Sequence, residues 1–382
     1  MKEYTQSELK SIYEKRRKIL ADFLTENEIG ACVFIDDESH RDPNLFYYSA
    51  FSSDAVLIIY NTGYSILIPW DENLAKKNAI CNKIIPFTRY SNDKYNALKS
   101  VLTTNRSKAK FEKTELPPYL TYIEYLKFLD KLNNFTCRCT EYGAHKFVTE
   151  CRMIKDNYEI ECIKEACRIG DLILDEIEKQ IHNAQIKTET DVALLIEKML
   201  RENNCQRTGF DTLAAGPLRS FAIHAFPGYT AQPWPAQGLS ILDFGVVYNG
   251  YTSDMTVTVA KGPLSPEQEK QLNLVQKVYD ECSKLYAPEK SIANAAKTAE
   301  LIFASEKRKM PHTLGHAIGL EIHEYPRVST KTDSSLLFKP GMILTCEPGL
   351  YDDKTGGCRL ENDILITKTG NEILTHSRII RI

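Results

Sequence analysis

The segment Leu239–Val259, LSILDFGVVYNGYTSDMTVTV, constrains the fold of this chain more than any other stretch. Two apolar runs flank Asn249-Gly250, a dipeptide typical of a two-residue β-hairpin turn. With this dipeptide as the loop, Asp254 lies opposite Gly245 of the first strand. Asp243 lies on that first strand, two residues from Gly245. Both aspartates then point to one face as diagonal neighbours, roughly 7–8 Å apart. Because a lone charge in an apolar strand is costly, the pattern indicates a polar site on that face.

A second pair of carboxylates follows the same geometry. The segments Gly341–Leu350 and Cys358–Thr367 flank a turn that is rich in Asp, Lys and Gly. Glu347 and Glu361 are equally far from the middle of that turn, so they face each other across a predicted hairpin. Like charges placed opposite each other destabilise a sheet unless a cation neutralises them.

The eight histidines are unevenly distributed. Four are scattered and are predicted to be surface or structural residues: His40, His145, His182 and His376. Of the others, His312, His316 and His323 fall in one short, apolar, glycine-containing segment, and His224 lies earlier in the chain. This cluster indicates a functional site.

Four carboxylates and one histidine on one face suit divalent cations, because four negative charges balance two such ions. Ligation by oxygen with one nitrogen favours manganese, cobalt, iron or zinc and disfavours a thiolate site. The eleven cysteines contain no C-x-x-C pair, the N-terminus has no signal-peptide pattern, and no run reaches roughly 18 apolar residues. We therefore expect free thiols, a cytoplasmic location and no membrane contact. A net charge of −3 also argues against a nucleic-acid partner.

The 382 residues are enough for two or three domains. The first part alternates strands and helices, beginning with a helix over 7–27 capped by Ser7. Strands are expected at 31–35, 55–60, 64–68, 83–87 and 108–111, and helices at 72–80, 92–103 and 117–132. Long helices at 155–182 and 187–203 then precede a strand-rich region and two further helices at 265–286 and 291–307. The change of pattern predicts domains at 1–147 and 148–382.

The acidic and histidine residues and their contexts resemble the pita-bread metallopeptidases, which include methionine aminopeptidase, aminopeptidase P and prolidase. The matching segments are LDFG, GYTSDMT, LGHAIGLEIHEYP, KPGMILTCEPGLY and CRLEND, and the likeness extends over roughly 150–382. The first 145 residues resemble the creatinase-type N-terminal domain, chiefly through Asn44–Phe51. The resemblance implies an α+β chain: a C-terminal pita-bread catalytic domain after a smaller α/β domain. This layout favours the prolidase and aminopeptidase P branch.

The resemblance also implies two bound divalent ions, most often manganese. Asp254 and Glu361 would bridge them, Asp243 would bind one, and His316 with Glu347 the other. A metal-bridging water or hydroxide would be the nucleophile, and Glu347 would also act as general base or proton shuttle.

Four further residues match substrate-contacting positions of these peptidases. His224 would contact the substrate and assist catalysis, and His323 would do the same by stabilising the oxyanion. His312 would line the pocket for proline. Arg359 would bind the substrate's carboxylate or support Glu361.

The implied activity is hydrolysis of the bond before proline in a peptide, by a homodimer. Dipeptides and longer peptides remain equally open as substrates. One alternative is a metal-dependent hydrolase of a small non-peptide C–N bond, prompted by the unusual segment His224–Gly238. A non-catalytic binding module is a further alternative. Val257 stands where many relatives have arginine, so a supporting salt bridge is not expected there.

Overall fold

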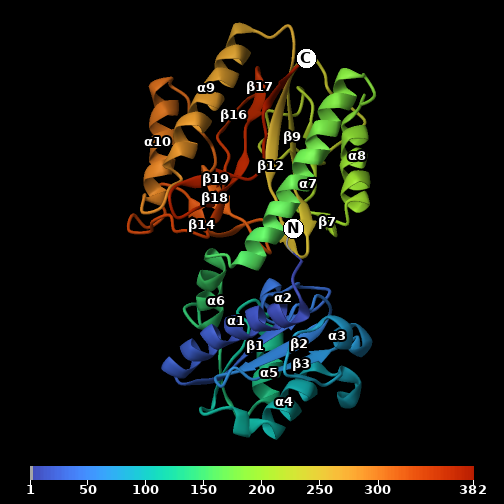
Figure 1. The fold of residues 1–382 in the computed structure, drawn as a ribbon, viewed down its shortest axis with the longest axis vertical. Coiled ribbons are helices and arrows are strands. Elements are labelled where there is room, and N and C mark those ends of the chain that lie inside the picture. The colour runs from blue at the N-terminus through green and yellow to red at the C-terminus, as the bar shows by residue number, and fades with distance from the viewer. Residues whose placement is uncertain (1–2) are drawn as a thin grey trace. The chain divides into compact units, whose positions relative to one another are not determined.

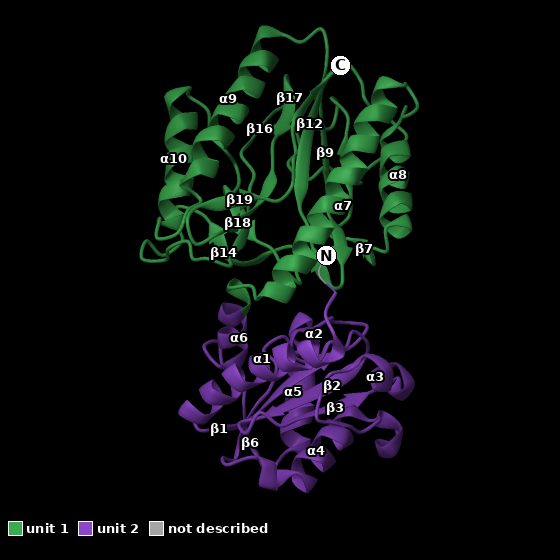
Figure 2. Cartoon of the chain, in the orientation of Figure 1, with its two compact units in different colours: residues 1, 152–382 green, residues 2–151 purple. Residues whose placement is uncertain are grey.

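The computed structural model describes residues 3–382. Residues 152–382 form one compact unit, and the described residues before Arg152 form the other (Figure 2). None of the described helices is long and apolar enough to cross a membrane. All eleven cysteines lie among the described residues and are free thiols.

The N-terminal unit is built on one six-stranded mixed sheet with the strand order β4-β3-β2-β1-β5-β6. Its strands are β1 (Ile29–Asp36), β2 (Ala55–Tyr60), β3 (Ser65–Pro69), β4 (Lys83–Ile84), β5 (Lys113–Glu115) and β6 (Thr136–Arg138). The helices are α1 (Gln6–Glu26), α2 (Pro43–Ser49), α3 (Glu72–Asn78), α4 (Lys94–Thr104), α5 (Tyr122–Lys131) and α6 (Ala144–Met153). The last two residues of α6 belong to the C-terminal unit. Strands β1, β2 and β3 are buried throughout and form the core of this α/β unit.

Local structure in this unit differs from the sequence prediction at several places. Helix α1 is capped by Thr5 and not by Ser7, because the Thr5 hydroxyl accepts the Glu8 amide and the Glu8 carboxylate accepts the Thr5 amide. The predicted strand at 108–111 is wrong, since residues 106–108 form a 3₁₀ helix and the strand begins at Lys113. The strand expected at 83–87 ends at Ile84 and is followed by a 3₁₀ helix at 87–90. Helices α2 and α6 and strand β6 were not predicted.

The C-terminal unit packs two pairs of helices around several sheets. The helices are α7 (Asn157–His182), α8 (Glu189–Glu202), α9 (Pro266–Cys282) and α10 (Ile292–Ser305). In Figure 1, α7 and α8 lie on one side of the strands of this unit, and α9 and α10 lie on the other. The strands are β7 (Arg207–Thr208), β8 (Leu213–Ala215), β9 (Gly238–Phe244), β10 (Val246–Tyr248), β11 (Tyr251–Thr252), β12 (Met255–Lys261), β13 (Gly315–Ala317), β14 (Glu324–Val328), β15 (Ile343–Cys346), β16 (Gly349–Asp352), β17 (Gly356–Arg359), β18 (Asn362–Ile366), β19 (Asn371–Ile373) and β20 (Ile379–Arg381).

Two of its sheets provide the scaffold of the functional region, with the orders β20-β12-β9-β8 and β14-β13-β15-β18-β19. Apolar residues of α7 and α8 pack against β9 and β12, while those of α9 and α10 pack against β15 and β18. Val257 is fully buried in the first of these cores. Its side chain therefore lies on the opposite face of β12 from Thr256, and the apolar residue at this position is explained by packing.

The first hairpin has the predicted register. Tyr248 pairs with Tyr251 around the turn, and Asn249 and Gly250 adopt φ angles of 48° and 85°. Further along, Asp243 pairs with Thr256. Between the two paired segments, Gly245 lies so close to the partner strand that an added Cβ would be 2.0 Å from the Ser253 carbonyl oxygen. A residue without a side chain is required at that position.

The second hairpin also has the predicted register. Strand β16 pairs with β17 so that Gly349 lies opposite Arg359, and β15 pairs with β18 so that Cys346 lies opposite Asn362. The β16–β17 and β15–β18 pairings have the same register. Glu347 and Glu361 lie between these paired segments and therefore face each other. An isolated bridge from Thr256 to Glu361 joins this hairpin to the first one.

Candidate metal centre

The nine site residues predicted from the sequence all line one cavity of about 780 Å³ in the C-terminal unit. They come from both hairpins, from β13 and the segments around it, and from the segment after β8. The nine are His224, Asp243, Asp254, His312, His316, His323, Glu347, Arg359 and Glu361. The structure therefore brings all of the predicted residues together.

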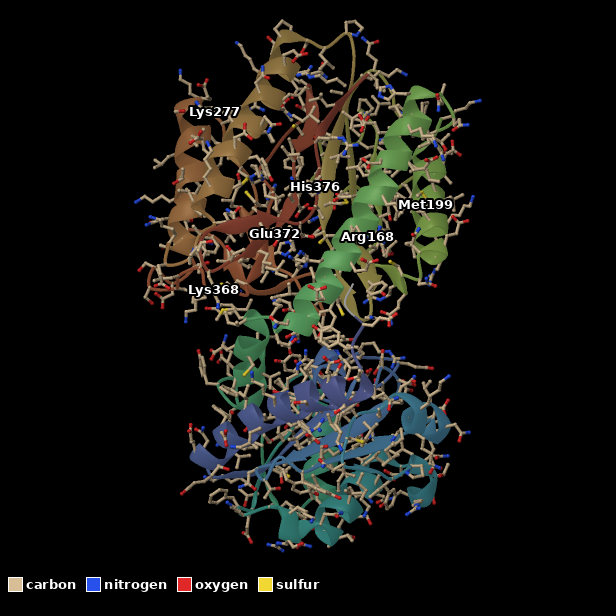
Figure 3. The ribbon with its side chains drawn as sticks, viewed as in Figure 1. Arg168, Met199, Lys277, Lys368, Glu372 and His376 are labelled. Atoms are coloured by element: carbon tan, nitrogen blue, oxygen red, sulfur yellow. The ribbon has the colours of Figure 1, made fainter. Side chains whose placement is uncertain are left out.

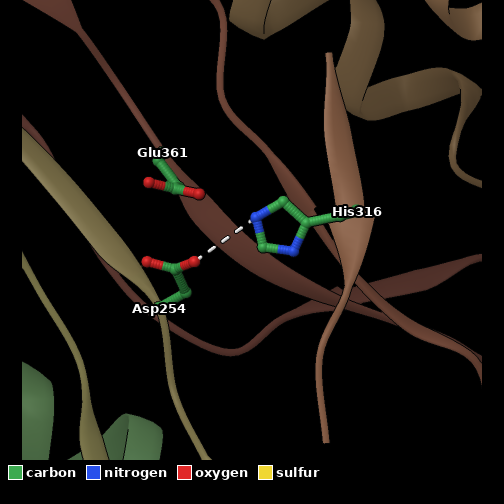
Figure 4. A group of neighbouring side chains, drawn as sticks. All are labelled: Asp254, His316 and Glu361. Carbon is green, nitrogen blue, oxygen red and sulfur yellow. Dashed lines mark ion pairs between the residues drawn. The ribbon is translucent and has the colours of Figure 1, made fainter. Parts of the chain in front are cut away.

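Three of these residues form a compact group of potential metal ligands. Asp254, His316 and Glu361 each offer one ligand atom, and these atoms lie within 4.8 Å of one another (Figure 4). His316 Nε2 is 3.5 Å from Asp254 Oδ2 and also 3.5 Å from the Oε1 atom of Glu347. One nitrogen and several carboxylate oxygens thus converge on a single point.

The tautomer of His316 suits a metal ligand. Its Nδ1 lies 3.2 Å from the carbonyl oxygen of Ala317, and because a carbonyl can only accept, Nδ1 carries the hydrogen. Burial, followed by the nearby His323, lowers the pKa of His316 to about 3. The ring is therefore neutral at neutral pH, and the lone pair of Nε2 faces the carboxylates.

The carboxylates are destabilised as anions when no cation is present. Burial, followed by the charge of Glu361, raises the pKa of Asp254 and of Glu347 well above the ordinary range. Burial and Asp243 raise the pKa of Glu361 to about 7. Like charges so close together in a largely buried site cannot all ionise, so the group fits a centre that binds cations.

Asp243 and Arg359 form a buried ion pair beside this group, in which Arg359 Nη2 donates to Asp243 Oδ2. The other oxygen of Asp243, Oδ1, is buried and has no hydrogen-bond partner among the described residues. An unpaired buried carboxylate oxygen on the wall of the cavity is a further observation that fits a bound cation.

Arg359 has all three of its guanidinium nitrogens engaged within the protein. Besides Asp243, it donates from Nε to the Thr256 hydroxyl at 3.0 Å and from Nη1 to the Tyr351 hydroxyl at 2.6 Å. The Thr256 hydroxyl in turn donates to Glu361 Oε2 at 2.6 Å. Of the two roles open from the sequence, these contacts favour the support of Glu361 over binding of the substrate's carboxylate.

His312 is held by the same network. Its Nδ1 lies 2.8 Å from the Thr313 carbonyl oxygen, and its Nε2 lies 3.1 Å from the Tyr351 hydroxyl. Because Tyr351 accepts from Arg359, its own hydrogen is available for Nε2 of His312. Burial, followed by Arg359, lowers the pKa of His312 to about 4, so this ring is also neutral.

Several residues around the centre were not found from the sequence. Thr256 and Tyr351 are hydrogen-bonding partners, and Asp363 accepts the backbone amide of Asp254 at 2.8 Å. Arg327 lines the cavity, and no carboxylate among the described residues pairs with its guanidinium. Thr256 and Asp363 each lie two residues from a predicted ligand on the same strand face, a spacing that could have indicated them.

His224 and His323 are exposed side chains that line the same cavity. The ring of His323 meets that of His316 edge to face, with centroids 4.4 Å apart. The four histidines predicted to be structural or surface residues do not line the cavity. His376, labelled in Figure 3, instead pairs with Asp171 at 2.7 Å.

Comparison with known proteins agrees with this geometry. The model of metallopeptidase family M24 matches residues 161–368. An Xaa-Pro dipeptidase of Pyrococcus horikoshii is 30% identical over 95% of this chain and 97% of its own length. An Xaa-Pro dipeptidase of Pyrococcus furiosus is 29% identical over 95% of this chain and 98% of its own.

Solved structures give the same result. The prolidase of Pyrococcus horikoshii superimposes with a TM-score of 0.82 at 25% identity, covering 96% of this chain and 99% of that one. An Xaa-Pro dipeptidase from Bacillus anthracis reaches a TM-score of 0.83 at 25% identity, covering 97% and 100%. These neighbours share the pita-bread fold predicted for the C-terminal part. The chain therefore belongs to metallopeptidase family M24 and has the pita-bread fold of that family.

Proposed function

We propose that this protein is a metal-dependent Xaa-Pro peptidase that hydrolyses the peptide bond before proline, and that dipeptides are its substrates. The observation that carries the proposal is the convergence of Asp254, His316 and Glu361 within 4.8 Å, with Asp243 and Glu347 on the same cavity. The two Xaa-Pro dipeptidases to which the chain is similar over almost its whole length support the choice of substrate.

The proposed cofactor is a pair of divalent ions, with manganese favoured and cobalt, zinc or iron as alternatives. Asp243, Asp254, Glu347 and Glu361 would supply carboxylate oxygens to these ions, and His316 would supply one imidazole nitrogen. When bound, the ions would lower the pKa of a water molecule so that a nucleophile forms at neutral pH.

Glu347 is the proposed general base. Its Oε1 lies 3.5 Å from His316 Nε2, and its Oε2 lies 3.8 Å from His312 Nδ1. The side chain is 15% exposed to the cavity, so it can accept a proton from the attacking water. Glu347 would then return that proton to the departing proline nitrogen, which becomes a secondary amine.

His323 and His224 are the proposed donors to the substrate. Partial desolvation at the cavity wall, followed by the charge of Arg327, lowers the pKa of His323, which favours a neutral ring with one N–H group. That N–H group can stabilise the negative charge that develops on the carbonyl oxygen of the scissile bond. His224 lines the same cavity and would orient the substrate.

Arg327 supplies the reason for preferring dipeptides. It is an exposed arginine in the cavity, whereas the guanidinium of Arg359 is buried and already engaged. In an Xaa-Pro dipeptide, a free carboxylate follows the proline ring directly. A guanidinium binds such a group with charge-assisted hydrogen bonds.

The test is hydrolysis by purified, manganese-loaded protein of a panel of Xaa-Pro dipeptides, matched Xaa-Ala dipeptides and small non-peptide amides. Cleavage of Xaa-Pro that is lost in Glu347→Gln supports the proposal. Absence of cleavage in the wild-type protein, or equal rates in Glu347→Gln, would refute it. Cleavage of the small amides alone would favour the alternative hydrolase of a non-peptide C–N bond.

The proposed role of Arg327 predicts that its substitution changes KM for one substrate but not for another. Arg327→Met should raise KM for an Xaa-Pro dipeptide by about tenfold or more, because a hydrogen bond to a charged group contributes about 1.5–3 kcal/mol. For the corresponding Xaa-Pro amide, which has no carboxylate, KM should change little. Equal effects on both substrates would contradict the proposed contact.

The proposal extends to the whole protein. Residues 148–382 would be the catalytic domain, and residues 1–147 a creatinase-like domain. A cytoplasmic location is supported by the eleven free cysteines. A homodimer is implied by family resemblance, and light scattering of the purified protein would test it.

A further inference from the structure

We propose that Glu324 is a positioning residue whose buried carboxylate binds the loop 318–323 and thereby holds His323 at the cavity. The loop joins β13, which carries His316, to β14, which begins at Glu324. The inference rests on the proposed function, because it concerns the placement of a residue assigned there to the substrate.

The Glu324 side chain supplies two hydrogen bonds to a loop that has little regular structure of its own. Residues 318–323 belong to neither a helix nor a strand. Glu324 Oε1 accepts the backbone amide of Leu320 at 2.9 Å and that of Glu321 at 3.3 Å. Gly319 lies against the same carboxylate, since an added Cβ would be 2.6 Å from Oε1. The carboxylate therefore occupies the space that the loop encloses.

The carboxylate is kept ionised by two cations inside the protein. Lys155 Nζ lies 3.1 Å from Glu324 Oε2, and Arg152 Nη2 donates to Oε1. The side chains of all three residues are at most 5% exposed. Burial alone would raise the pKa of Glu324, but Arg152 and Lys155 lower it to about 2. An ionised acceptor forms stronger hydrogen bonds to backbone amides than a neutral one does.

The position of the His323 ring depends on its backbone. No hydrogen bond from another described residue holds this ring. It contacts the ring of His316 edge to face, with the two ring centroids 4.4 Å apart. The ring is therefore placed by the backbone on either side of it: the loop before it and Glu324 directly after it. Displacement of the loop would move His323 relative to the metal ligand His316.

The contact can be tested by a matched pair of double variants. Glu324→Gln alone would leave Arg152 and Lys155 buried without a balancing charge, which strongly destabilises a protein. Both test variants therefore also carry Lys155→Met, which removes one cation and leaves Arg152 paired with Glu321 at 2.8 Å. Glu324→Gln/Lys155→Met keeps an oxygen that accepts the loop amides. Glu324→Met/Lys155→Met has the same charge and a similar length but no such acceptor.

Two measurements are made on both variants after their metal content and folding have been checked. Hydrogen exchange of the peptide 318–323 reports directly on the loop amides. Steady-state kinetics with an Xaa-Pro dipeptide separate kcat from KM. We expect wild-type protection and kcat within about threefold in the Gln variant. In the Met variant, the loop should exchange faster and kcat should fall by about tenfold or more, with KM within about threefold.

The outcomes separate this inference from the proposed function. Equal exchange and equal kcat in the two variants would overturn the role of Glu324 even if the wild-type protein is an active Xaa-Pro peptidase. Faster exchange in the Met variant together with an inactive wild-type protein would refute the proposed function but leave the loop contact established.

Discussion

Replacement of Thr256 by valine should weaken metal binding without changing any proposed ligand. The Thr256 hydroxyl is fully buried, donates to Glu361 Oε2 at 2.6 Å and accepts from Arg359 Nε at 3.0 Å. Valine has nearly the same shape, so the substitution removes these two hydrogen bonds and little packing. Glu361 would lose a donor that orients its carboxylate toward the cavity.

The expected loss can be estimated from the contacts. A hydrogen bond to a charged group contributes about 1.5–3 kcal/mol, and each 1.4 kcal/mol corresponds to about tenfold in affinity. Thr256→Val should therefore raise the Kd for Mn²⁺ by about 10- to 100-fold, which is the range found for outer partners of metal ligands. Isothermal titration of the metal-free protein with Mn²⁺ measures this change.

Thr258→Val is the matched control. Thr258 lies on the same face of the same strand and is equally buried, but its hydroxyl bonds the backbone of Arg359 at 2.9 Å and 3.0 Å. It should lower thermal stability and leave the Kd for Mn²⁺ near the wild-type value. The reasoning is refuted if Thr256→Val binds Mn²⁺ as tightly as the wild-type protein, or if both valine variants lose affinity equally.

Three further predictions follow from the described contacts. The pKa values of Asp254 and Glu361 are raised in the metal-free protein, so Mn²⁺ binding should release protons near pH 7. Titration calorimetry in buffers of different ionisation enthalpy measures this release. Binding heats that are the same in all buffers would contradict the prediction. Burial lowers the pKa of His145 from 6.5 to about 4, so its stabilising contribution is complete above pH 6.5 and declines as the pH falls toward 4. About 2 kcal/mol should be lost between pH 7 and 5, and urea unfolding of His145→Phe should show a correspondingly flatter pH dependence. Gly245→Ala should destabilise the protein by about 3 kcal/mol or more and reduce its metal content, because the new Cβ would collide with the Ser253 carbonyl; wild-type thermal stability in this variant would be inconsistent with the hairpin geometry.

The parts of the site that could be predicted from the sequence are those determined by local geometry. The Asn249-Gly250 turn and the alternation of side chains along a strand were sufficient to place Asp243 and Asp254 on one face. The same alternation placed Glu347 opposite Glu361 across a second turn. Both registers are confirmed, because each depends on residues close together in the chain.

Local structure was less predictable where several short-range options compete. Thr5 and Ser7 are both good helix caps, and only the reciprocal hydrogen bonds of Thr5 with Glu8 decide between them. Residues 108–111 contain apolar side chains, but pairing with the sheet begins only at Lys113, where β5 lies beside β1. A short apolar run does not by itself indicate where a strand joins its neighbours.

The tertiary structure decided how the segments combine. Thr256 and Glu361 are 105 residues apart in the chain, yet their hydrogen bond joins the two hairpins at the centre of the site. The contacts that favour one of the two roles open for Arg359 likewise form only after folding, when Thr256, Tyr351 and Asp243 surround its guanidinium. Turn residues and strand alternation act over a few residues, so the sequence alone determined which carboxylates could face one another. Which hairpins meet, and which partners their side chains find, depends on the packing of the whole core and therefore only on the folded chain.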